Sequence, residues 1–141
     1  MKVLLDTTYL LPAVGIEVDL PEDLLEKLFT SNHLFIINEL SLFELFGKAS
    51  RLISGKEKAR DRFYIGMKSI LSSKIDLKPV FTLDTLPVVR KVHERIRDLP
   101  DCPIVATAIV YSDVMLTEAK DIPKLVDFEV LDLTRFAEKY L

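Results

Sequence analysis

Short apolar runs alternate with longer segments of helical periodicity along the whole chain. Strands buried on both faces appear as continuous runs of Val, Ile, Leu and Phe, because helices cover both sides of a parallel sheet. The alternation therefore predicts one α/β domain over residues 1–141, a three-layer α/β/α arrangement with a central, mostly parallel five-stranded sheet. The strands are predicted at Lys2–Leu5, Leu34–Ile37, Leu77–Phe81, Val114–Leu116 and Glu129–Leu131.

The segments between these runs carry apolar residues at helical spacing. In the segment after the second strand, one stripe of large apolar residues is expected to face the core, with Glu44 on the opposite side. Asp84 is a candidate N-cap for a later helix. Helices are predicted at Pro21–Phe29, Glu39–Ile53, Lys56–Leu71, Leu86–Arg97 and Pro103–Tyr111, and the stripe consists of Leu42, Leu45, Phe46, Ala49, Leu52 and Ile53.

Composition narrows the class of protein. No apolar run approaches the roughly 20 residues of a membrane span, so a cytoplasmic protein without a membrane partner is expected. The single cysteine, Cys102, excludes an internal disulfide and a cysteine-based zinc site. The mean hydropathy of +0.23 leaves more apolar surface than one small core hides, which favours a homodimer.

Net charge is −3, so the molecule as a whole is not a basic nucleic-acid binder. The stretch between Lys48 and Lys68 is nevertheless basic, with seven Lys and Arg against two acidic residues. Lys48 and Arg51 follow Glu44 at i+4 and i+7, on the same helix face. This stretch is either a solvated pair of helix faces or a rim that contacts phosphates.

Three acidic residues are candidates for a site. Asp6 directly follows the first predicted strand, and ligands of α/β folds collect beyond the carboxyl ends of the strands. Taken singly, Asp6 fits equally well as a helix cap, Asp101 fits better as a helix cap, and Glu44 fits better as the partner of Lys48 in a surface pair. Asp113 and Asp127 precede strands, which places them at the opposite edge.

The three acidic residues sit in segments whose order resembles the PIN-domain family. The segments are residues 4–11 (LLDTTYLL), 38–45 (NELSLFEL) and 101–108 (DCPIVATA), followed by Val114–Thr117. The resemblance covers nearly the whole chain, and within the family it is greatest to the toxin ribonucleases of VapBC-type toxin–antitoxin modules. It implies an endoribonuclease that hydrolyses RNA, a homodimer, and an antitoxin protein as a partner.

The resemblance also implies roles for individual residues. Asp6, Glu44 and Asp101 match the family's catalytic metal ligands, and Mg²⁺ or Mn²⁺ is the expected cofactor, in agreement with the preference of hard cations for carboxylates. Thr8 and Thr117 match supporting hydroxyl residues. Lys48 and Arg51 are candidate RNA contacts from charge and helix face, and Glu118 and Asp121 are candidates for a fourth ligand.

One position departs from the family pattern. The family commonly has an Asp two residues beyond the hydroxyl residue at Thr117, and here that position is Ala119. The chain is accordingly either a metal-dependent nuclease or a PIN fold that binds RNA or protein without turnover. A third interpretation, phosphoryl transfer through Asp6 as nucleophile, ranks low because Thr8 stands where an Asp-x-Asp motif would continue.

Overall fold

Five parallel strands form the centre of the molecule. The computed structural model describes residues 1–141, and its sheet has the strand order β3-β2-β1-β4-β5. Every neighbouring pair is parallel, with Val3 opposite Phe35 of β2 and Val114 of β4. The α/β class and the five-stranded sheet are thus confirmed. The strands are β1 (Lys2–Leu5), β2 (Leu34–Asn38), β3 (Asp76–Lys78), β4 (Val114–Leu116) and β5 (Val130–Leu131).

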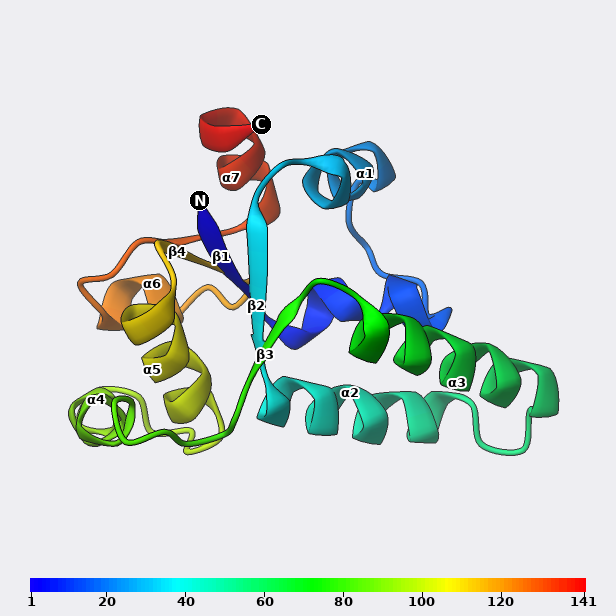
Figure 1. Ribbon diagram of the computed structural model, residues 1–141, viewed down its shortest axis with the longest axis horizontal. Coiled ribbons are helices and arrows are strands. Elements are labelled where there is room, and N and C mark those ends of the chain that lie inside the picture. The colour runs from blue at the N-terminus through cyan, green and yellow to red at the C-terminus, as the bar shows by residue number, and fades with distance from the viewer.

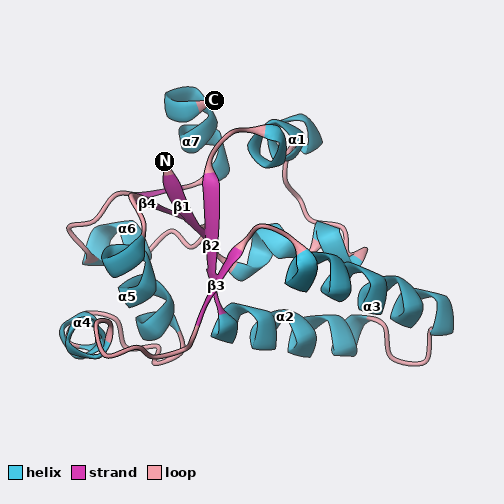
Figure 2. Cartoon of the chain, in the orientation of Figure 1, coloured by secondary structure: helices cyan, strands magenta, loops and turns pink.

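Helices cover both faces of the sheet (Figures 1 and 2). Because side chains alternate along a strand, Val3 and Leu5 belong to one buried cluster and Leu4 to the other. The first face carries α1 (Glu22–Thr30), α2 (Glu39–Leu52), α3 (Glu57–Ser72), α7 (Leu133–Tyr140) and the 3₁₀ turns η1 (Thr7–Leu10) and η2 (Pro12–Val14). The second carries α4 (Leu86–His93), α5 (Asp101–Tyr111) and α6 (Ile122–Leu125).

Helices α2 and α3 run side by side and extend away from the sheet (Figure 1). Their contact includes Phe46 and Phe63, whose ring centroids are 5.1 Å apart in an edge-to-face arrangement. At its middle, α3 approaches η2 so closely that a Cβ on Gly66 would lie 2.2 Å from the carbonyl oxygen of Ala13. Gly66 is therefore required for the docking of α3.

Several element boundaries differ from the sequence prediction. The third strand is Asp76–Lys78 rather than Leu77–Phe81, because Pro79 has no N–H to donate to the sheet. The fourth helix ends at His93 and its N-cap is Thr85, not Asp84. Helix α5 begins at Asp101, two residues before Pro103, and the sequence analysis did not identify α6 or α7.

The apolar stripe predicted on α2 is only partly buried. Leu45 and Ala49 are fully buried, but Phe46 and Leu52 are 43% and 59% exposed, because the outer part of α2 extends beyond the sheet. Phe43, outside the stripe, is 76% exposed. None of the helices has the length and apolar character that crossing a membrane requires.

We predict opposite effects of alanine at two helical glycines. Gly66→Ala should lower the free energy of unfolding by about 1–3 kcal/mol, because its methyl group forces η2 and α3 apart. Gly47→Ala on α2 should raise it by about 0.5–1 kcal/mol, because no atom lies within 4 Å of the added Cβ and alanine favours the helix. Urea denaturation measures both, and equal stabilities of the two variants would contradict the close approach of α3.

Candidate metal centre

Asp6 is held in one orientation at the carboxyl end of β1. Its Oδ1 accepts a hydrogen bond from the backbone N–H of Thr7 at 2.8 Å, and its Oδ2 accepts one from the Thr117 hydroxyl at 2.6 Å. Its own N–H continues the sheet by donating to Leu116 of β4. The carboxylate is thus fixed jointly by two neighbouring strands, as predicted for a residue that follows β1.

Glu44 reaches the same place from α2. The Thr7 hydroxyl, which is buried, donates to Oε2 of Glu44 at 3.0 Å. Thr7 therefore links Asp6 and Glu44 through its backbone N–H and its side chain. The sequence analysis assigned a supporting role to Thr8, whereas the structure gives these hydrogen bonds to the neighbouring Thr7. Thr117 does bond Asp6, at the end of β4.

Asp101 faces the other two carboxylates from the first turn of α5. Burial is the largest of the causes that raise its pKa from the ordinary value near 3.8 to about 7. The negative charges of Asp98, Asp6 and Glu44 and a hydrogen bond with Asp98 supply the rest. The three predicted residues therefore share one electrostatic environment. Asp98, in the loop before α5, is an additional acidic neighbour that the sequence analysis missed.

Asn38 positions the two helices that carry Glu44 and Asp101. It ends β2, is fully buried, and caps α2 by accepting a hydrogen bond from the N–H of Leu40 at 2.8 Å. Its side-chain NH₂ donates to Thr107 Oγ1 at 2.8 Å and to the carbonyl oxygen of Pro103, both in α5. The same group reaches the carbonyl oxygens that follow β3, so one amide ties three segments together.

The two candidates for a fourth ligand are placed differently. One carboxylate oxygen of Glu118 accepts hydrogen bonds from the Tyr9 hydroxyl and, at 3.0 Å, from the N–H of Leu133 at the start of α7. Burial, followed by the hydrogen bond and charge of Glu118, raises the pKa of Tyr9, so the phenol keeps its proton. Asp121 is exposed at the start of α6.

The position of Ala119 lies beside the site. Its N–H donates to the Thr117 hydroxyl oxygen at 3.2 Å, and the same hydroxyl donates to Asp6. Lys48 and Arg51, the candidate RNA contacts, are exposed on α2, and Arg51 bonds only the carbonyl oxygen of Gly47, at 3.4 Å. The edge of the sheet thus holds three carboxylates with basic residues on the adjoining helix.

No group of three or more His, Cys, Asp or Glu side chains is already arranged as a metal site. The donor set nevertheless suits a hard divalent cation, since Asp6, Glu44 and Asp101 offer only carboxylate oxygens. Burial, and after it the neighbouring negative charges, raise the pKa of Asp101, and a cation would relieve the repulsion among these charges. By donor chemistry, the residues fit the predicted Mg²⁺ or Mn²⁺.

Neither a protein-family model nor a curated protein matches the sequence. Among solved structures, the chain is similar to VapBC2 from Rickettsia felis bound to a DNA fragment from their promoter (17% identity, TM-score 0.67). It is also similar to DNA-bound VapBC from Salmonella typhimurium (16%, TM-score 0.68) and to FitAcB from Neisseria gonorrhoeae (16%, TM-score 0.66). Each alignment covers 94% of this chain and 98% of the other.

At these identities the likeness shows the fold alone. Because each alignment covers 94% of this chain, the shared arrangement extends far beyond a single βαβ unit. The comparison confirms the PIN-domain fold that the sequence resemblance predicts.

The raised pKa of Asp101 predicts how the stability of the metal-free protein depends on pH. The folded state holds this proton more tightly than the unfolded chain, so its contribution to stability is complete below pH about 4 and is lost as the pH rises to about 7. Asp101→Asn should remove this loss and be more stable than wild type at pH 8. Thermal unfolding in EDTA across this pH range measures it.

Asp127→Asn is the matched control, because Asp127 is exposed and precedes β5 at the opposite edge of the sheet. It should keep the wild-type fall in melting temperature. If Asp101→Asn shows the same fall as Asp127→Asn, then Asp101 does not face the other carboxylates as described.

Proposed function

We propose that this chain is a divalent-metal-dependent endoribonuclease that hydrolyses RNA phosphodiester bonds. The observation that carries the proposal is the convergence of Asp6, Glu44 and Asp101 from three different elements on the carboxyl edge of the sheet, with hydroxyl groups orienting the first two. The PIN-domain fold supports it, because that resemblance implies a ribonuclease with these residues as ligands.

A bound Mg²⁺ or Mn²⁺ would supply a Lewis acid for the scissile phosphate and a water of lowered pKa. The protein's part is to hold the ligands. Thr117 and Thr7 donate to Asp6 and Glu44, which leaves their carboxylates as acceptors in fixed orientations. Asp101 is partly protonated near neutral pH, so cation binding there is coupled to release of a proton.

We further propose that the chain is the toxin of a toxin–antitoxin pair and acts in the cytoplasm. The similar structures are those of VapBC and FitAcB, and the two VapBC structures are bound to DNA. This supports an antitoxin protein as partner. The exposed apolar side chains, among them Phe43, Leu52 and Ile65, favour a homodimer that covers part of this surface.

A second candidate function is a PIN fold that binds RNA or protein without turnover. Two observations favour it: Ala119 offers no carboxylate, and the acidic side chains are not already arranged around a metal ion. Glu118 is also committed to Tyr9 and α7. The two candidates differ in what divalent metal does to RNA.

The nuclease proposal predicts cleavage of mixed RNA in Mg²⁺ or Mn²⁺ that stops in EDTA. Asp6→Asn should lower the rate by more than about 100-fold, because it removes a ligand while keeping the side chain's shape. Asp127→Asn should cut at the wild-type rate. Gel analysis of end-labelled RNA measures the rate of cleavage. Cleavage that resists EDTA, or that persists in Asp6→Asn, would contradict the proposal.

Ala119→Asp tests whether the fourth position limits metal binding. The new carboxylate, beside Thr117, should raise the affinity for Mn²⁺, and Ala119→Asn, of the same shape without charge, should not. Calorimetric titration of the metal into each protein measures the change. Equal affinities of Ala119→Asp and wild type would show that this position does not reach the ion.

A further inference from the structure

A cavity of about 380 Å³ opens next to the carboxylates, at the ends of β4 and β5. Thr117, which bonds Asp6, forms part of its wall, so the cavity adjoins the proposed metal centre. Most of the residues that line it are polar or charged. The residues used below are Thr117, Ala119, Lys120, Lys124, Asp132 and Arg135.

The negative groups of this cavity are already engaged within the protein. Glu118 accepts from Tyr9 and from the start of α7. Asp132 caps α7 by accepting from the N–H of Arg135 at 2.8 Å, and its other oxygen lies 3.9 Å from the Arg135 side chain. Each of these two carboxylates therefore accepts hydrogen bonds from donors within the protein.

The two lysines of this cavity, by contrast, are not engaged in ion pairs within the protein. Lys120 and Lys124 are exposed and take part in none of the chain's three salt bridges. Ala119 contributes a methyl group to the wall where a carboxylate would add negative charge. The cavity is thus suited to a compact anion, although the protein's net charge is negative.

Sheet topology places this cavity in line with the metal centre. Glu44 enters from the helix after β2, Asp6 follows β1, and the cavity follows β4 and β5, in the spatial order of the strands. Neighbouring strands are about 4.8 Å apart, so the cavity lies roughly 5–10 Å from the end of β1. That separation is on the scale of one or two nucleotides of an extended backbone.

We propose that this cavity binds a backbone phosphate of RNA next to the scissile one, with Lys120 and Lys124 as its cationic contacts. The assignment rests on the proposed nuclease function. Together with Lys48 and Arg51 beyond Glu44, it places cations on both sides of the carboxylates, so that the RNA strand crosses the metal centre along the edge of the sheet. Phosphate contacts of this kind fix the position of the strand without reading its sequence.

The test uses the purified full chain and a short fluorescein-labelled single-stranded RNA in EDTA, where no cleavage is expected. Fluorescence anisotropy between 50 and 200 mM salt gives the affinity and its salt dependence. Lys120→Glu/Lys124→Glu should weaken binding to RNAs of different sequence alike. The slope of log K against log salt should become shallower by about 0.7 for the lost contact with a single strand.

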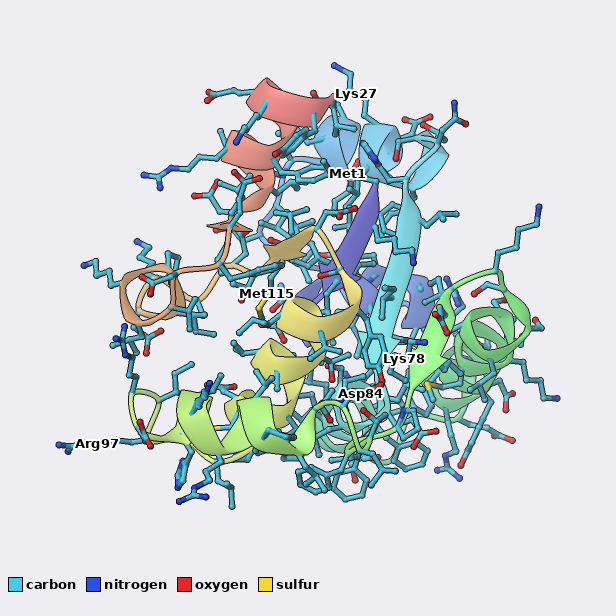
Figure 3. The ribbon with its side chains drawn as sticks, turned by 60° about the vertical axis from the view of Figure 1, so that its left-hand side comes forward. Met1, Lys27, Lys78, Asp84, Arg97 and Met115 are labelled. Atoms are coloured by element: carbon cyan, nitrogen blue, oxygen red, sulfur yellow. The ribbon has the colours of Figure 1, made fainter.

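Lys27→Glu/Lys74→Glu is the control of equal charge change. Lys27 lies in α1 and Lys74 precedes β3, both at the amino edge of the sheet, and Figure 3 shows Lys27 near Met1 and far from Lys78 at the other end. This pair should retain the wild-type slope. Equal weakening in both pairs, or wild-type affinity in Lys120→Glu/Lys124→Glu, would overturn the assignment.

A polyglutamate peptide separates RNA from an acidic protein segment as ligand. Binding of the peptide as tight as that of the RNA, with the same dependence on Lys120 and Lys124, would overturn the assignment to nucleic acid. Cleavage assays with Mg²⁺ are run in parallel. If the wild-type protein does not cleave RNA but the lysine pair weakens RNA binding, the phosphate site is retained and the nuclease function is rejected. If the wild-type protein cleaves RNA but the lysine pair leaves binding unaltered, the nuclease function is retained and the phosphate site is rejected.

Discussion

The parallel pairing of all five strands is the constraint on which this structure depends. Parallel neighbours cannot be joined by tight turns, so each connection crosses over the sheet, and the helices bury both faces. The same pairing places every carboxyl end at one edge. Asp6, Asn38 and Thr117 each follow directly on, or end, a strand, and they meet at that edge although more than one hundred residues separate the first from the last.

Neutral polar groups, not cations, hold the acidic cluster together in the protein itself. Thr7, Thr117 and Asn38 donate hydrogen bonds that fix two carboxylates and the helices around them. A Lys or Arg in their place would neutralise the carboxylates and compete with a metal ion. Burial and the neighbouring negative charges raise the pKa of Asp101, so ionising all of these carboxylates destabilises the folded protein. The packed cores on either side of the sheet offset this destabilisation.

Sequence reasoning predicted the sheet and its strands, because two-sided burial leaves a clear signal. It also named the three acidic residues from their order along the chain, and their role as a site stays a prediction. It failed where the outcome depends on local backbone rotation. Thr7 and Thr8 both follow Asp6, and only the 3₁₀ turn that begins at Thr7 decides which hydroxyl faces Glu44. Likewise Asp98 is a neighbour of Asp101 through a local turn, in which the N–H of Asp101 donates to the carbonyl oxygen of Asp98 at 3.1 Å.

In the segment after β4, the residue at position 119 determines the charge beside the three carboxylates. Glu118 and Ala119 occupy successive positions. One carboxylate oxygen of Glu118 accepts two hydrogen bonds, one from the Tyr9 hydroxyl and one from the N-terminus of α7. With a methyl group at the second position, this segment places one carboxylate, that of Glu118, in the cavity wall beside Lys120 instead of two. The methyl group of Ala119 therefore keeps the cavity wall beside Asp6 and Thr117 free of a further negative charge, which is the condition under which Lys120 and Lys124 can serve the proposed phosphate site.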